Sequence, residues 1–211
     1  MEFRSKFIKV GGERIPDIIE YLKERIKINP NLTISVGCDS SQKKRRVAYA
    51  ITIMMHDRTI RNGAHVVFFR IYEKGKMDIY KRLYKEGEII FALSEFIDSE
   101  LLEFYTRKDL DDDNIKKYKL HLEQHKGNHM YLDFYQEMEI IKSMPITKKD
   151  RETTYKLCDV HLDYNIDFND GRNKSHNVYK SVIPWFKSSG YRVWCKPYSH
   201  ASTSAADLLV K

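Results

Sequence analysis

Four acidic residues stand where a carboxylate fits poorly into ordinary packing: Asp39, Glu86, Asp163 and Asp207. Asp39 follows the apolar run 34–38 and marks the carboxyl end of an expected buried strand, and Asp163 closes a second strand-like run over 155–162. Asp207 lies among small and apolar residues of an expected C-terminal helix, whose small side chains allow close packing on a sheet. Each aspartate alone also fits a turn or a helix cap. Their order and contexts together fit one site that binds two divalent metal ions.

Glu86 lies in an expected helix over about residues 78–105, on the stripe that carries the apolar side chains of that helix. It follows Leu83 by three residues and precedes Ile90 by four, which places it on the buried side. A buried carboxylate without a partner is costly or stays protonated, and a bound divalent cation removes this difficulty. Glu88, two residues further along the same helix, remains an alternative ligand.

The elements that must position these residues alternate along the chain. A first helix is expected from Pro16, as its first residue, to the stop at 29–31. The Asp39 strand and strands over 47–55 and 64–72 form a three-strand meander. After the Glu86 helix we expect four further elements: the strand ending at Asp163, a helix around 175–189 interrupted by Pro184, a strand over 191–195, and the final helix. This alternation predicts an α/β protein with a mixed sheet that includes parallel strands.

Residues 107–150 are rich in charge and are interpreted as an inserted helical lid or arm within a single domain spanning residues 1–211. The run Lys116, Lys117, Tyr118 and Lys119 could grip a nucleic-acid strand by phosphate contact and stacking, or form a solvated helix face. Three histidines at helical spacing, His121, His125 and His129, could hold a transition metal, but a structural role or none fits them better.

Three segments resemble the signatures of the YkuK family of the ribonuclease H-like superfamily. They are Val36-Gly37-Cys38-Asp39-Ser40-Ser41-Gln42, His161-Leu162-Asp163 with the following residues 170–175, and Lys196-Pro197-Tyr198-Ser199-His200-Ala201-Ser202 with Ala206-Asp207. The resemblance implies a ribonuclease H-like mixed five-stranded sheet flanked by helices. It also implies a cluster of acidic residues that binds divalent metal.

By this resemblance Asp39 bridges two Mg²⁺ or Mn²⁺ ions, Asp207 completes the ion on the nucleophile side, and Glu86 and Asp163 hold the other ion. Further residues near the three signatures are expected to assist: His161 and His200 as proton carriers, Lys196 as a phosphate contact, and Ser40, Ser41 and Ser199 as hydrogen-bond partners of a nucleic-acid backbone. A packing role fits His161 equally well.

The composition agrees with a nucleic-acid partner. Lys and Arg number 37 against 30 Asp and Glu, which gives a formal charge of +7. The three cysteines, Cys38, Cys158 and Cys195, lie singly in apolar runs and are expected to be buried free thiols in a reducing compartment. No signal-type segment or membrane-spanning stretch is present in the sequence, so a cytoplasmic protein without a membrane partner is expected.

No Walker phosphate loop, nucleophile elbow or dinucleotide fingerprint is present in the sequence. The prediction is therefore a divalent-metal-dependent nuclease that hydrolyses phosphodiester bonds of RNA, RNA–DNA hybrid or DNA by a two-metal mechanism. Two alternatives stay open: a non-catalytic nucleic-acid-binding module with the same fold, and an interaction protein whose acidic residues are capped and salt-bridged.

Overall fold

The computed structural model describes residues 2–29, 32–57, 64–101, 156–165, 175–196 and 198–210. Within them the chain forms the following elements in order: β1 (Ile8–Lys9), α1 (Ile18–Ile28), β2 (Leu32–Lys43), β3 (Arg46–Asp57), β4 (His65–Lys74), α2 (Ile79–Leu101), β5 (Cys158–Asn165), α6 (Ser175–Ser188), β6 (Arg192–Lys196), the π-helix η3 (Ala201–Ala206) and α7 (Asp207–Val210). The predicted arm over 107–150, with its histidines and its basic run, lies outside the described residues.

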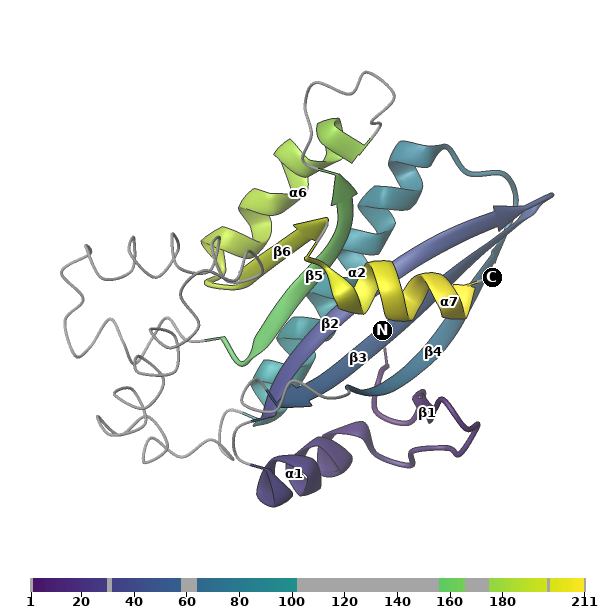
Figure 1. Cartoon of the computed structure of the whole chain (residues 1–211). Helices are drawn as coiled ribbons and strands as arrows, with labels where there is room; N and C mark the ends of the chain where they lie inside the picture. Colours follow the sequence, from purple (N-terminus) through teal and green to yellow (C-terminus); the bar gives the residue numbers. More distant parts are fainter. Residues whose placement is uncertain are drawn as a thin grey trace, which may run out of the picture. The chain divides into compact units, whose positions relative to one another are not determined.

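The strands form one mixed sheet in the order β1-β4-β3-β2-β5-β6 (Figure 1). Strands β2, β3 and β4 pair antiparallel, as the predicted meander requires, whereas β5 pairs parallel to both β2 and β6. The prediction of a mixed α/β sheet is confirmed, with one addition. The edge strand β1 has only two residues, which is too short to show an alternating pattern in the sequence.

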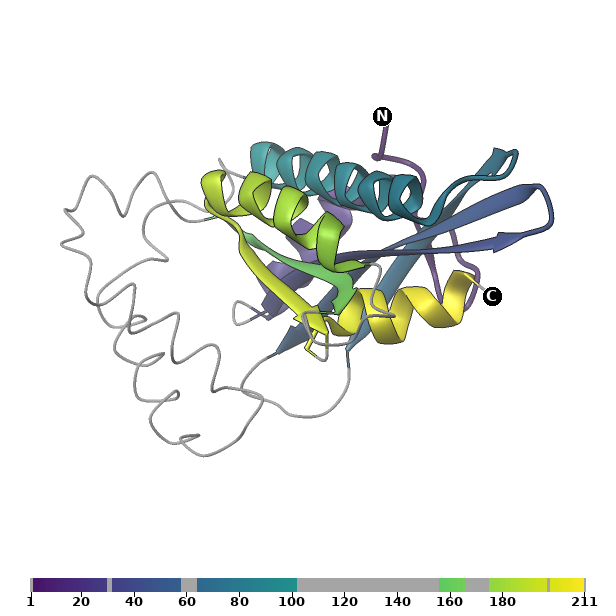
Figure 2. The same ribbon diagram turned by 90° about the horizontal axis from the view of Figure 1, so that it is seen from above.

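Helices cover both faces of this sheet. Figure 2 shows α2 and α6 on one face and the helical segment η3–α7 on the other. A Cβ atom on Gly87 of α2 would lie 2.8 Å from Val182 Cγ1 of α6, so this glycine is what allows the two helices to approach so closely. Covered on both faces, β3 is buried from Tyr49 to Met55, which explains its nearly continuous apolar run.

Three predicted boundaries and one predicted interruption of a helix are wrong. Helix α1 begins at Ile18 and not at Pro16, because Asp17 is its N-cap residue. The Asp17 Oδ1 atom accepts hydrogen bonds from the amides of Ile19 and Glu20. Helix α6 runs through Pro184 without interruption. Its buried side, which includes Val182 and packs against α2, outweighs the local cost of about 3 kcal/mol for a proline inside a helix.

The other two wrong boundaries are strand ends. Strand β2 continues to Lys43 and β5 to Asn165, so Asp39 and Asp163 lie inside strands and not at their carboxyl ends. The polar residues after Asp39 lie beyond the predicted strand end, but they remain paired with β3 as far as Lys43 opposite Arg46. Burial ends before the hydrogen-bonded strand does, and an apolar run reports only burial.

Cys38 and Cys158 are buried free thiols, as expected, and Cys195 is a half-buried one. Burial first, and then the charges of Glu86 and Asp39, raise the pKa of the Cys38 thiol well above its usual range. This thiol therefore stays protonated and is a poor metal ligand. None of the helices in the described ranges is both long and apolar enough to cross a membrane.

Candidate metal centre

Two of the predicted carboxylates come from neighbouring parallel strands on the same face of the sheet. In the register of β2 and β5, Cys38 lies opposite Leu162, and Asp39 and Asp163 are the next residues of the two strands. Successive strand residues alternate between faces, so both aspartates point away from the face of Cys38 and Leu162. Their adjacency depends on the parallel pairing of β2 with β5, which are far apart in the chain.

This face is the one that η3 covers, because η3 rests directly on β2 at Gly37, two residues before Asp39. A Cβ atom on Gly37 would lie 2.6 Å from both Ala201 C and Ser202 N. Thr52 of β3 fixes the same point, since its hydroxyl oxygen lies 2.7 Å from the Ala201 carbonyl oxygen and 3.2 Å from that of Gly37. The contact brings Asp207, the first residue of α7, to the face of the sheet that carries Asp39.

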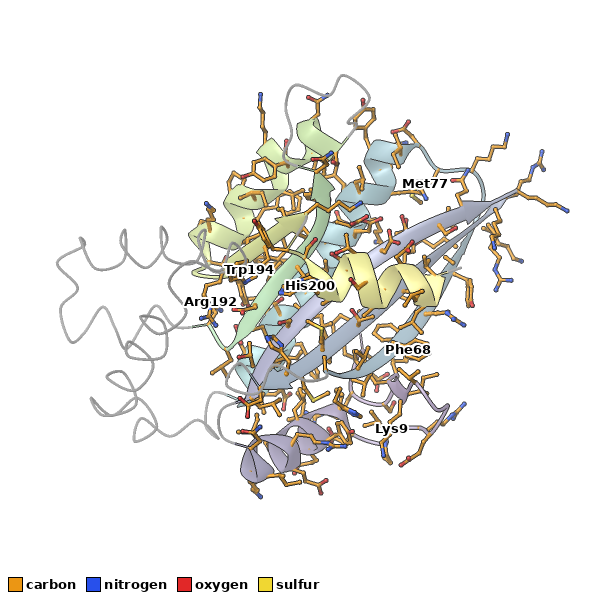
Figure 3. The ribbon with its side chains drawn as sticks, viewed as in Figure 1. Lys9, Phe68, Met77, Arg192, Trp194 and His200 are labelled. Atoms are coloured by element: carbon orange, nitrogen blue, oxygen red, sulfur yellow. The ribbon has the colours of Figure 1, made fainter. Side chains whose placement is uncertain are left out.

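His161 is also part of the support for η3. Its side chain is 5% exposed, and its Nδ1 accepts a 3.0 Å hydrogen bond from the Ala201 amide at the start of η3. An accepting Nδ1 carries no proton, so the ring is neutral with its proton on Nε2. His161 thus has the packing role that the sequence left open. His200, by contrast, is exposed at the start of the C-terminal helical segment (Figure 3).

Glu86 lies on α2, which covers the face of the sheet opposite to η3. Its side chain is 2% exposed, as the apolar stripe predicted. Ser40, the residue after Asp39, donates a 2.5 Å hydrogen bond to Glu86 Oε1, and Arg82 Nη1 donates to the Ser40 carbonyl oxygen at 3.2 Å. The other oxygen, Glu86 Oε2, is buried without a hydrogen-bond partner among the described residues. Such an atom is expensive in a folded protein unless a ligand compensates it.

The neighbouring carboxylates on α2 and β5 show how unusual Glu86 is. Glu88 is 57% exposed and lies 3.5 Å from Lys85 Nζ, so it belongs to the solvated side of α2. Asp159 of β5 is as buried as Glu86, but Arg192 Nε lies 2.6 Å from its Oδ1. Of these three, Glu86 is the one that is buried with an uncompensated oxygen.

Neighbouring acidic residues affect the protonation of Asp39 and Glu86. Burial first, then the charges of Asp163 and Asp207, raise the pKa of Asp39 to about 7, against the lowering effect of the hydrogen bond from the Ser40 amide. Burial is also the main cause that raises the pKa of Glu86 well above its usual range. The charges of Asp39 and Asp163 add to it, and the Ser40 hydroxyl opposes it. Burial and the neighbouring acidic side chains therefore both disfavour the charged forms of Asp39 and Glu86.

This region is not a closed coordination shell. Within the described ranges, no three His, Cys, Asp or Glu side chains are grouped closely enough to hold one ion. Lys196 Nζ also lies 2.9 Å from Asp163 Oδ1 and neutralises part of that charge. The donors are nonetheless hard carboxylate oxygens, and the uncompensated Glu86 Oε2 fits a Mg²⁺- or Mn²⁺-type ligand.

The serines predicted to bind nucleic acid occupy different environments. Ser40 is engaged with Glu86, and Ser41 is half-buried on the face of Asp39, opposite Ala48. Ser199 is fully buried, with its hydroxyl 3.4 Å from that of Thr203 in η3, so it supports the helix and does not present a surface contact. Lys196, at 42% side-chain exposure, remains accessible.

Sequence reasoning missed Gly37, Thr52 and Arg82 as supports of this region. A glycine inside an otherwise apolar strand is the one available signal, because it often marks the close approach of another backbone. Thr52 and Arg82 act through contacts between segments distant in the sequence, and nothing local distinguishes them.

The mixed sheet, helices on both faces and a carboxylate cluster contributed by β2, β5, α2 and α7 define an α/β protein with an acidic site. A family model described as Ribonuclease H-like matches residues 13–211, so the chain belongs to the ribonuclease H-like family. This family indicates a nuclease or nucleic-acid-binding fold. Comparison with curated proteins and with solved structures gives no match.

Proposed function

We propose that this protein is a divalent-metal-dependent nuclease that hydrolyses phosphodiester bonds of RNA, RNA–DNA hybrid or DNA. The observation that carries the proposal is Glu86, a fully buried carboxylate with one uncompensated oxygen, held by the residue next to Asp39. A protein without a cationic ligand gains nothing from this arrangement, since burial and repulsion both oppose the charged forms of these groups.

In this proposal Asp39, Glu86, Asp163 and Asp207 hold Mg²⁺ or Mn²⁺, and the ions supply an activated water and stabilise the leaving oxygen. The chain's own residues do the rest. Ser40 Oγ fixes the rotamer of Glu86, and the contact of η3 with Gly37 fixes the start of α7 and so Asp207. Lys196 Nζ exchanges Asp163 for a substrate phosphate, and the exposed imidazole of His200 delivers a proton to the leaving oxygen.

A second candidate is a non-catalytic nucleic-acid-binding module with the same fold. It is favoured by the absence of a group of three potential ligands in the described part of the chain and by the ion pair between Lys196 and Asp163. In this case the acidic cluster would be compensated by lysine and by protonation, and metal would be unnecessary.

The test is cleavage of labelled single-stranded RNA, RNA–DNA hybrid, duplex DNA and branched DNA with Mg²⁺ or Mn²⁺. Glu86→Gln and Glu88→Gln make a matched pair, because both remove one carboxylate from α2 but only Glu86 is buried. A nuclease predicts that Glu86→Gln and Asp39→Asn abolish cutting while Glu88→Gln retains it. Equal activity in the two glutamine variants, or cutting that persists in chelator, would reject the assignment. Nucleic-acid binding without any cutting by the wild type would favour the binding module.

A further inference from the structure

The β2–β3 hairpin extends beyond the helices on both faces of the sheet (Figures 1 and 2). The two strands stay paired to their last residues, Lys43 opposite Arg46, and the loop between them consists of Lys44 and Arg45. All four consecutive basic side chains are exposed. The projecting hairpin thus presents four consecutive basic side chains to solvent.

The basic side chains at the last pair of the hairpin, Lys43 and Arg46, share the face of Asp39. Counting in steps of two from Asp39 leads to Lys43, and the strand pairing places Arg46 opposite Lys43 and Lys74 opposite Arg46. Tyr72 joins them as the exposed neighbour of Lys74 on the same side of β4. We refer to these residues together with the loop as the hairpin surface: Lys43, Lys44, Arg45, Arg46, Tyr72 and Lys74.

Acidic residues are nearly absent from the hairpin segments. Glu73 is the only Asp or Glu in residues 43–46 and 70–76, and it pairs with the buried Val47, on the opposite face. These two segments therefore carry seven Lys or Arg residues against one Glu. The hairpin surface begins on β2, the strand that also carries Asp39, so this strand leads from a candidate metal ligand to a group of basic side chains.

Arg46 is held in a defined orientation. Its guanidinium carbon lies 3.9 Å from the centre of the Tyr72 ring, and Tyr72 is 50% exposed. Stacking on an aromatic ring leaves the edge of the guanidinium, with its N–H donors, directed outward. A planar fork of donors that is already oriented suits the oxygens of a phosphate group.

Lys44 occupies a backbone conformation that costs free energy. Its φ is 53°, in the left-handed region, at the first position of a two-residue hairpin loop where glycine or asparagine is usual. A side chain in this region costs about 1–2 kcal/mol. Lysine at such a position is explained if the exposed ammonium group binds a ligand, whereas glycine would serve the fold better.

We infer that the hairpin surface binds the sugar–phosphate backbone of a nucleic acid, whatever the base sequence. The bound nucleic acid then runs along β2 toward Asp39. At ~3.3 Å per residue, Lys43 lies about 13 Å along β2 from Asp39. This is the length of about four nucleotides of a duplex at 3.4 Å each. The surface thus contacts phosphates about four or more nucleotides from the scissile bond. The inference rests on the proposed function only for the position of that bond.

The test compares two double variants that each remove two positive charges. Lys44→Gly with Arg45→Gln alters the loop, and the glycine relieves the strain at Lys44, so the fold is retained or stabilised. Lys6→Gln with Lys27→Gln is the control: both lysines are exposed, and Lys27 precedes β2 at the end opposite the hairpin. Binding of labelled RNA and DNA of about 20 nucleotides, in chelator, is followed by fluorescence anisotropy between about 50 and 200 mM KCl.

The expected result is an affinity loss of about tenfold at low salt for the hairpin variant, with a salt slope reduced by about 1.4–1.8 for two lost phosphate contacts. The control variant should lose less than about threefold, because it changes only the net charge. Equal losses in both variants would overturn the inference. Unchanged nucleic-acid binding together with hairpin-dependent binding to vesicles containing phosphatidylserine would overturn it in favour of a membrane surface.

The result is distinguishable from a failure of the proposed nuclease. If no substrate is cut but the hairpin variant alone loses binding, the hairpin surface stands and catalysis does not. If cutting requires Asp39 and Glu86 while the hairpin variant binds like the control, catalysis stands and the hairpin surface does not.

Discussion

Replacing Gly37 by alanine tests the contact on which the position of Asp207 depends. The added Cβ atom would lie 2.6 Å from Ala201 C, 2.6 Å from Ser202 N and 2.9 Å from Ala201 O. Ordinary contacts between carbon atoms are about 3.5–4.0 Å. All three neighbours are backbone atoms of η3, so no side chain can rotate away, and η3 must move by about 1 Å to restore ordinary contact.

The cost follows from what that movement disturbs. Overpacking of a tight interior costs about 1–3 kcal/mol. The movement would also distort two hydrogen bonds, that of the Ala201 carbonyl with Thr52 and that of the Ala201 amide with His161. Each contributes about 1 kcal/mol to stability. Against this, an alanine in place of glycine gains up to about 1 kcal/mol from the unfolded chain. We therefore expect a net destabilisation of about 2–4 kcal/mol and a fall of roughly 5–15 °C in melting temperature.

Thermal unfolding followed by circular dichroism measures this, with Gly11→Ala as the matched control. A Cβ atom on Gly11 would meet nothing within 4 Å, so this variant should melt within about 2 °C of the wild type. If the two alanine variants melt together, η3 does not rest on β2 at Gly37. The placement of Asp207 near Asp39 would then lose its support.

Further predictions concern charge in the acidic region. In chelator, stability should fall as the pH rises from about 4 to about 7, because the pKa of Asp39 is raised to about 7 and the folded state binds the extra proton. The part of this loss that Asp39 contributes is at most about 4 kcal/mol, and urea unfolding at several pH values measures it. Asp39→Asn should reduce the slope, while the raised pKa of Glu86 keeps part of it. Adding Mg²⁺ at pH 8, to a concentration about 100 times its dissociation constant, should raise the melting temperature by roughly 5–10 °C in the wild type but not in Glu86→Gln. Asp98→Ala should destabilise the fold by about 1–3 kcal/mol without changing metal response, since Asp98 Oδ1 accepts from the Leu157 amide at 3.0 Å, at the other end of α2. A metal response lost in Asp98→Ala as well would show that the response reports global folding.

Much of the fold could be predicted because it depends on local periodicity. The apolar runs of β2, β3 and β4 and the stripe on α2 that contains Glu86 are visible in short windows of sequence. The ends of β2 and β5 could not be located in this way, because hydrogen bonding to a neighbouring strand continues after burial has stopped. The π-helical form of η3 is likewise absent from any local pattern, although its small residues did predict close packing.

In the candidate site, too, local features could be predicted from the sequence, whereas contacts between distant segments could not. Burial of Glu86 follows from its spacing to Leu83 and Ile90, which is local. The neighbourhood of Asp39 and Asp163 follows from parallel pairing of strands that the chain joins through a long connection, and here the family resemblance supplied what periodicity cannot. The ion pair of Lys196 with Asp163 and the bond of Ser40 to Glu86 follow from that pairing and from the position of α2, so they too were beyond the sequence.

Strand β2 connects these observations physically. Asp39 and Ser40 are consecutive, so they point to opposite faces, the first toward the face of η3 and α7 and the second to Glu86 of α2. A slip of one residue in the pairing of β2 with β3 would exchange the two and separate the carboxylates. The register is fixed by a ladder from Leu32–Asp57 to Lys43–Arg46, which ends in the basic hairpin. The same strand pair that projects positive charge outward thus also fixes the positions of Asp39 and of Ser40, which holds Glu86. A change at the hairpin that shifts this register should therefore impair the acidic site at a distance, whereas Lys44→Gly, which preserves it, should not.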